Sequence, residues 1–133
     1  MKLFWSDEFD RQLTRYEGLA AQSARDQKIL DLLAAMLSKL RALDGVPVSE
    51  TAMLKRVRQS GRHLVWRQSH PFESGIALRL ICWFPDDSDG DTDRVVVALF
   101  AGDKASMGDV FYDSVGSRAD QIIDQWLREQ QEE

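Results

Sequence analysis

The segment Arg94–Tyr112, RVVVALFAGDKASMGDVFY, determines the expected fold of this chain. Its residues 95–100 form an apolar run rich in β-branched side chains, which predicts a strand that is buried on both faces. The strand is expected to end at Gly102, because glycine adopts backbone angles that other residues avoid. Asp103 and Lys104 follow directly, so we expect the central strand to leave the core beside two charges.

Two helices are predicted to precede this strand. Ser6 is a typical N-cap, and the apolar residues that follow it repeat at helical spacing, which predicts a first helix over residues 7–20. Residues 29–43 carry one apolar stripe, which predicts a second helix that Gly45 and Pro47 terminate. Because a short polar turn joins the two segments, we expect a helical hairpin packed on a sheet.

Further strands and a last helix complete the expected fold. Residues 2–5 are expected to form a short edge strand, and alternating polarity predicts strands from Arg62 onward and over residues 76–84. Ser117 begins a capping box, which predicts a C-terminal helix. The expected fold class is α+β, with a small and mostly antiparallel sheet in a single domain of residues 1–133.

The composition is that of an ordinary globular domain. Of the 133 residues, 44% are hydrophobic and 29% are charged, and no apolar run approaches the roughly 20 residues that span a bilayer. The first ten residues are too short and too acidic a stretch for a signal peptide, and Cys82 is the single cysteine, so no disulfide framework is expected. The sequence therefore predicts a cytoplasmic protein without a membrane partner.

The charge is distributed unevenly along the chain. The net charge is −5, yet residues 53–79 contain six basic residues and one acid, whereas residues 85–133 contain thirteen acids and four bases. A basic island of this kind holds phosphate locally, although the acidic remainder weakens long-range attraction of RNA. The island provides the predicted RNA contacts Lys55, Arg56, Arg58 and Arg62, together with two arginines on the predicted strands.

His63, Arg67 and Arg79 are the candidate site residues on the predicted strands. Alternation places His63 on the same face as Arg67, where it is either a proton carrier or an exposed strand histidine. Arg79 lies inside an otherwise apolar strand, where a charge is costly unless it is paired or faces a cleft. Arg79 therefore either forms an ion pair with an acid such as Asp103 or holds a phosphate in its planar fork.

Metal and nucleophile chemistry is not expected. A calcium loop that begins at Asp87 in the acidic segment 85–93 would need a glycine at Thr92 and a glutamate at Ala98, and neither is present. His63 and His70 have no third ligand at metal spacing, and Cys82 alternates with apolar residues as a core residue does. No cofactor or metal site is therefore predicted.

Three segments carry a resemblance to a known family. The stretch RHLVWRQS resembles a strand of alternating cations, IALRLICWF resembles a YRLVY-type strand, and VVVALFAGDKASMGDVFY resembles a terminal VVV…GKR…VY segment. In this order and spacing they are similar to the RelE/ParE superfamily of bacterial toxins, including its HigB-like branch.

The resemblance implies a metal-independent endoribonuclease of a type II toxin–antitoxin system that cleaves mRNA at the ribosome. It implies that Arg79 holds the phosphate, that His63 and Arg67 occupy cationic positions, and that His63 is the possible base. It further implies that Lys104 is the candidate acid, that Tyr112 (or Phe111, if the register shifts by one) stacks on a nucleobase, and that an antitoxin protein is the partner.

A second hypothesis keeps the fold without catalysis. Val65 stands where RelE-like sequences place a lysine, and Lys104 is the single cation of a turn that commonly has two or more. The alternative function is therefore a non-catalytic binding protein, either a ParE-like inhibitor of its target or an inactive toxin homologue. In a third hypothesis the chain is a general interaction domain whose cations pair with its many acids.

Overall fold

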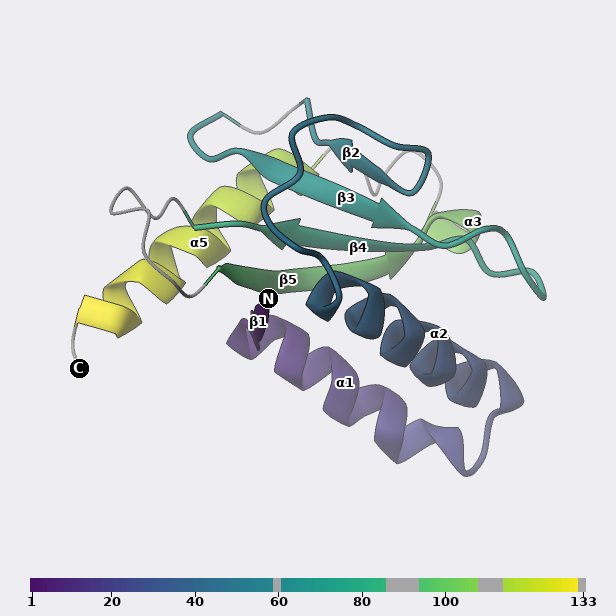
Figure 1. Cartoon of the computed structure of the whole chain (residues 1–133). Coiled ribbons are helices and arrows are strands. Elements are labelled where there is room, and N and C mark those ends of the chain that lie inside the picture. The colour runs from purple at the N-terminus through teal and green to yellow at the C-terminus, as the bar shows by residue number, and fades with distance from the viewer. Residues whose placement is uncertain (59–60, 86–93, 108–113, 132–133) are drawn as a thin grey trace.

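The computed structural model describes residues 1–58, 61–85, 94–107 and 114–131, which form an α+β fold with a mixed five-stranded sheet. The order of the strands is β1-β5-β4-β3-β2, in which β1 runs parallel to β5 and the other neighbours are antiparallel (Figure 1). In chain order the elements are β1 (Lys2–Trp5), α1 (Asp7–Ala20), α2 (Ala24–Arg41), β2 (Leu54–Arg56), β3 (Val65–Ser69), β4 (Leu78–Trp83), β5 (Val95–Asp103), α3 (Lys104–Met107) and α5 (Val115–Gln131).

Strand β5 lies inside the sheet and is buried on both faces, as its apolar run predicts. Val96, Ala98 and Ala101 contribute to one hydrophobic core, and Val97 and Leu99 contribute to the core on the opposite face. The strand continues through Gly102 to Asp103, so its end lies slightly beyond the predicted position.

Helices cover both faces of the sheet. Residues of α1 and α2 pack into the core that contains Trp66, Leu80 and Cys82, and residues of α5 pack into the core that contains Ile81 and Trp83. Figure 1 shows α1 and α2 together on one side of the sheet and α5 on the other. The side of the sheet that α5 covers is called the α5 face below.

Ser6 connects β1, β5 and α1. The register of β4 and β5 shifts between Ile81 and Cys82, so Leu99 has no partner residue in β4. The Ser6 hydroxyl donates to the Leu99 carbonyl oxygen at 2.6 Å and accepts the N–H of Phe9 at 3.0 Å, which makes Ser6 the N-cap of α1. The N-cap predicted at Ser6 is therefore confirmed, and the same side chain satisfies the carbonyl of the bulge.

The helix ends differ from two predictions. Helix α2 ends at Arg41 with Ala42 as its C-cap, a few residues before the predicted terminators. Helix α5 begins at Val115, so the capping box predicted at Ser117 is wrong. The cause is burial, because Val115 and Ala119 both pack into the α5-face core and extend the helix toward its N-terminus.

The strand boundaries also differ in part. Strand β3 begins at Val65, so the predicted strand start at Arg62 is wrong and His63 lies in the bend before the strand. The segment predicted as either loop or strand forms the short strand β2. The acidic segment 86–93 and Tyr112 lie outside the described residues. Within the described ranges, no helix is both long enough and apolar enough to cross a membrane.

Candidate functional site

Three cations from adjacent strands lie on the α5 face of the sheet. Lys55 of β2 is directly opposite Arg67 of β3, and Arg67 is opposite Ile81 of β4. Arg79 lies two residues before Ile81 and therefore shares this face with Arg67 as a diagonal neighbour. Lys55 and Arg67 therefore concentrate positive charge at this point of the face.

A cavity of about 310 Å³ lies over this part of the face, and it is called the cationic cavity below. It extends between β2, β3, β4 and the first residue of α5. The described residues that line it are Glu50, Lys55, Arg56, Val57, Arg58, Arg67, Ile81 and Val115. Three basic side chains and one acid face this cavity, because Arg56 directs its guanidinium to the opposite face of the sheet, and the excess of positive charge suits an anion such as phosphate.

Glu50 is the acid of the cationic cavity, and it comes from the segment between α2 and β2. Its Oε1 accepts the backbone N–H of Arg56 at 3.0 Å, and its Oε2 is 3.9 Å from Nη2 of Arg58. The carboxylate therefore holds the end of β2 in place and offsets part of the positive charge. No local pattern in the sequence indicates this role, because the segment has no periodicity.

Arg79 is held by backbone carbonyls. Its Nη1 donates to the carbonyl oxygens of His70 at 3.2 Å and Leu78 at 3.0 Å, and its cross-strand neighbours are Ser69 and Gly102. Among the described residues Arg79 forms no ion pair. These contacts orient the guanidinium and leave its positive charge available for a ligand.

Asp103 pairs with Arg25 of α2, so the ion pair considered between Arg79 and Asp103 is not formed. Burial alone would raise the pKa of Asp103, but donors surround its carboxylate and lower the pKa below its ordinary value. The donors are the backbone N–H groups of Ala77 and Ala105, the hydroxyl of Ser106 and the guanidinium of Arg25. Asp103 thus fixes the point at which β5 passes into α3.

Lys104 is the first residue of α3. Its backbone N–H donates to the carbonyl oxygen of Ala77 at 2.9 Å, and its side chain is half-buried. It lies two residues beyond Gly102, the position opposite Arg79. The structure therefore places Lys104 and Arg79 at the same end of the sheet.

His63 is separated from these cations. Its Nε2 lies 3.0 Å from Oδ1 of Asp124 on α5, and its ring packs edge-to-face on Trp83 with 5.7 Å between the centroids. Trp83 pairs with Val65, which lies two residues before Arg67 in β3. The predicted grouping of His63 with Arg67 therefore holds for the side of the sheet but not for the position along it.

Asp124 also forms an ion pair with Arg62, so the side chain of this predicted RNA contact is bound to helix α5. The hydrogen bond from His63 lowers the pKa of Asp124, and the charge of Arg62 lowers it further. Sequence reasoning missed Asp124, because it lies 61 residues from His63 in the chain. The amphipathic pattern of the last helix does not indicate which of its acids faces β3.

The other predicted RNA contacts lie around the end of β2. Arg56 points to the face opposite Arg67, where its guanidinium carbon lies 5.5 Å from the centroid of the Trp66 ring. Arg58 has a highly exposed side chain. Tyr112, the predicted stacking residue, lies outside the described residues.

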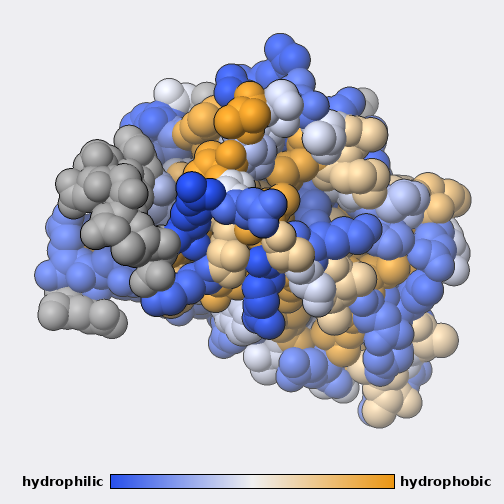
Figure 2. All heavy atoms as spheres, viewed as in Figure 1, coloured by the Kyte–Doolittle hydropathy of each residue, from blue (hydrophilic) through white to orange (hydrophobic). Residues whose placement is uncertain are grey.

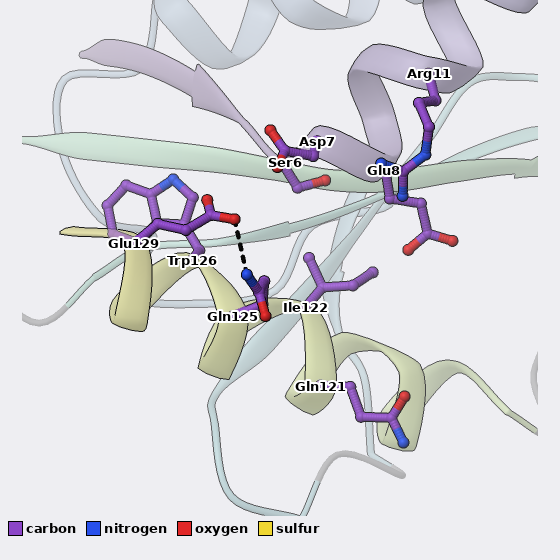
Figure 3. Close-up of a pocket in the computed structure, with 9 residues that line it drawn as sticks. All are labelled: Ser6, Asp7, Glu8, Arg11, Gln121, Ile122, Gln125, Trp126 and Glu129. Atoms are coloured by element: carbon purple, nitrogen blue, oxygen red, sulfur yellow. Dashed lines mark hydrogen bonds between the residues drawn. The ribbon is translucent and has the colours of Figure 1, made fainter. Parts of the chain in front are cut away.

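A cleft of about 300 Å³ lies between α1 and α5, and acids outnumber bases among the described residues that line it. Figure 3 shows Asp7, Glu8 and Arg11 of α1 on one side of the cleft and residues of α5, among them Ile122, Trp126 and Glu129, on the other. Three acids and one base make this cleft unfavourable for phosphate. The cationic cavity is therefore the better candidate for binding an anion.

The structure offers little support for other site chemistry. Among the residues described, no group of three or more histidine, cysteine, aspartate or glutamate side chains is arranged to hold a metal ion. Cys82 is buried in the core as predicted, and burial raises the pKa of its thiol to about 12. A thiol of this kind is not a nucleophile at neutral pH.

No family model matches this chain, and no curated protein or solved structure matches it either. Its function must therefore be argued from its own residues.

Proposed function

We propose that this protein binds RNA phosphate in the cationic cavity and acts as a RelE/ParE-type toxin. The observation that carries the proposal is the placement of Lys55, Arg67 and Arg79 on one face of three adjacent strands. Lys55 and Arg67 line the cationic cavity, and Arg79 lies diagonally beside Arg67 on the same face. Arginine forks match phosphate oxygens and lysine adds a compact positive charge, so Lys55 and Arg67 would contact a phosphate in the cavity and Arg79 would contact the adjoining part of the RNA backbone.

The proposed activity is endoribonuclease cleavage of mRNA at the ribosome, without a metal ion. In this reaction a ribose 2′-hydroxyl attacks the adjacent phosphorus, its proton passes to a base, and the 5′-oxygen leaves with a proton from an acid. Arg67 and Arg79 would stabilise the charge that develops on the phosphate oxygens. Lys104 is the proposed acid, because it lies at the same end of the sheet as Arg79.

The proposed base is His63, with Asp124 as the residue that orients its ring. His63 lies at the Trp83 end of β4 and Lys104 at the Arg79 end, so this reaction requires an RNA backbone that runs along β4 between them. Asp124 accepts from Nε2, so Nδ1 is the nitrogen that would take the proton of the hydroxyl. Tyr112 remains the proposed stacking residue. The proposal includes the finer RelE-like arrangement, with α1 and α2 as the helical hairpin, and a cognate antitoxin as the protein partner.

One observation favours a second candidate, a non-catalytic binding protein on the same fold. His63 contacts Trp83 and Asp124, whereas Arg67 lies at the cationic cavity, two residues beyond the partner of Trp83 in β3. A protein that binds RNA, or another target, without cleaving it needs the cations alone. The two candidates predict the same binding site and differ in whether RNA is cut.

The test is expression in bacteria, with growth and mRNA integrity measured for the unmodified protein, Arg67→Ala and Arg79→Ala. Arg15→Ala is the matched control, because Arg15 is exposed on α1 and contacts Tyr16. Growth arrest with mRNA cleavage that either site variant relieves would support the nuclease. Arrest with intact mRNA would support the binding protein, and neither arrest nor RNA binding in vitro would overturn both.

A further inference from the structure

A second and larger cavity adjoins the cationic cavity at the end of β2, the last strand in the order of the described sheet. It has a volume of about 580 Å³ and is called the β2-edge cavity below. It shares Glu50, Arg56, Val57 and Arg58 with the cationic cavity, and it adds Val48, Ser49 and Leu64. A ligand that occupies one cavity therefore reaches the other across the same short segment of chain.

The residues that are specific to the β2-edge cavity include two exposed apolar side chains. Val48 is 94% exposed and Leu64 is 52% exposed, so neither contributes much to the stability of the fold. Figure 2 shows apolar residues directly beside strongly hydrophilic ones in the part of this view where Figure 1 places β2 and β3. The cavity thus combines apolar contact surface with arginine side chains.

The polar groups of this cavity are held in place. The guanidinium of Arg56 packs on Trp66, and its backbone N–H is bound by Glu50. A guanidinium that packs on an indole ring loses little freedom when it contacts a ligand. Its N–H groups, and the hydroxyl of Ser49, are suitable partners for a flat ligand with polar edges.

We propose that the β2-edge cavity binds an unpaired nucleobase next to the phosphate in the cationic cavity. A nucleobase has two apolar faces and a polar edge. Its faces match Val48 and Leu64, and its edge matches the arginine side chains. The base of a duplex is stacked and paired, so only single-stranded RNA presents it in this way. This inference rests on the proposed binding of RNA phosphate and adds a site that distinguishes RNA from a simple polyanion.

The test is fluorescence anisotropy with a labelled oligouridine of eight nucleotides and an oligomer of equal length whose riboses carry no base. We expect the double variant Val48→Ser, Leu64→Ser to bind oligouridine about fivefold more weakly and the abasic oligomer unchanged. Both side chains are exposed, so the variant should keep its thermal midpoint. Phe72→Ser is the matched control, because Phe72 is 69% exposed and lines neither cavity.

The outcomes separate this inference from the proposed function. Lys55→Ala should weaken binding of both oligomers, because it acts on the phosphate. If the double variant binds oligouridine normally, or loses affinity for both oligomers equally, the base site is overturned. If Lys55→Ala and Arg67→Ala change neither affinity, the phosphate site is overturned instead.

Discussion

Arg25 of α2 binds Asp103 at the end of β5, with 2.5 Å between Nη2 and Oδ2. The two residues are 78 positions apart in the chain. This contact attaches the second helix to the end of the central strand. Asp103 is opposite Leu78, on the face that α1 and α2 cover, whereas Arg79 lies on the α5 face.

We expect Asp103→Asn to lower the free energy of unfolding by about 3 kcal/mol, because the substitution leaves donors around a buried carboxylate position poorly satisfied. Urea unfolding at neutral pH measures the change. Arg25→Gln should cost less, because the Arg25 side chain is 51% exposed. A loss below about 1 kcal/mol for Asp103→Asn would contradict the role assigned to this residue.

The same residue predicts a pH dependence of stability. The pKa of Asp103 is lower in the folded protein than its ordinary value of 3.8, so the ionised carboxylate stabilises the folded state. This contribution is fully present above the ordinary value and is lost as the pH falls through the lower, folded-state value. Unfolding curves of the unmodified protein and Asp103→Asn should therefore converge toward low pH. Curves that stay parallel would exclude this linkage.

His63→Ala should reduce mRNA cleavage without reducing RNA affinity. His63 lies one pleat from the cations, so its removal leaves the phosphate contacts intact, while loss of a general base costs about a hundredfold in rate. Anisotropy and single-turnover cleavage measure the two quantities separately. Equal loss of affinity in His63→Ala and Arg67→Ala would place the histidine among the phosphate contacts instead.

Glu50→Gln should strengthen RNA binding by about threefold and steepen its dependence on salt. The substitution removes the negative charge of the cationic cavity and retains an oxygen that accepts the N–H of Arg56. Anisotropy titrations at several salt concentrations give both quantities. Glu73→Gln is the control, because Glu73 pairs with Lys28 outside the cavity. Weaker binding of Glu50→Gln would show that the carboxylate contributes to RNA contact.

Cys82 should not react with thiol reagents in the folded protein. Burial raises the pKa of its thiol to about 12, so little thiolate is present at pH 8 and the sulfur is inaccessible. Labelling with Ellman's reagent should be undetectable in buffer and complete in guanidinium chloride. Fast labelling in buffer would show that the core around β4 opens readily.

Local patterns predicted the elements of the fold better than they predicted the site. The apolar stripe of α2 and the alternation in β4 are short-range features, and both were confirmed because burial imposes the same periodicity on sequence and structure. The start of α5 was misplaced, because the burial of Val115 depends on strands far away in the chain.

The candidate site depends on such distant contacts even more strongly. Alternation placed His63 and Arg67 on one side of the sheet, since the period of two needs no tertiary information, but that Arg79 shares this side follows only from the pairing of β3 with β4. Their neighbours could not be predicted in the same way. The carboxylate that binds Arg25 lies 78 residues away in the chain, and the one that binds His63 lies 61 residues away. No local pattern in the sequence indicates which acid contacts which basic residue.

The contact between Ser6 and Leu99 has a consequence for the order in which the protein folds. Strand β1 pairs only with β5 among the described residues, and the Ser6 hydroxyl completes its pairing 93 positions further along the chain. During synthesis the first strand therefore waits about 5 to 20 seconds until its partner has left the ribosome. Until then Phe4 and Trp5 lack their neighbouring strand, so we expect chaperones that hold exposed aromatic segments to bind this part of the nascent chain.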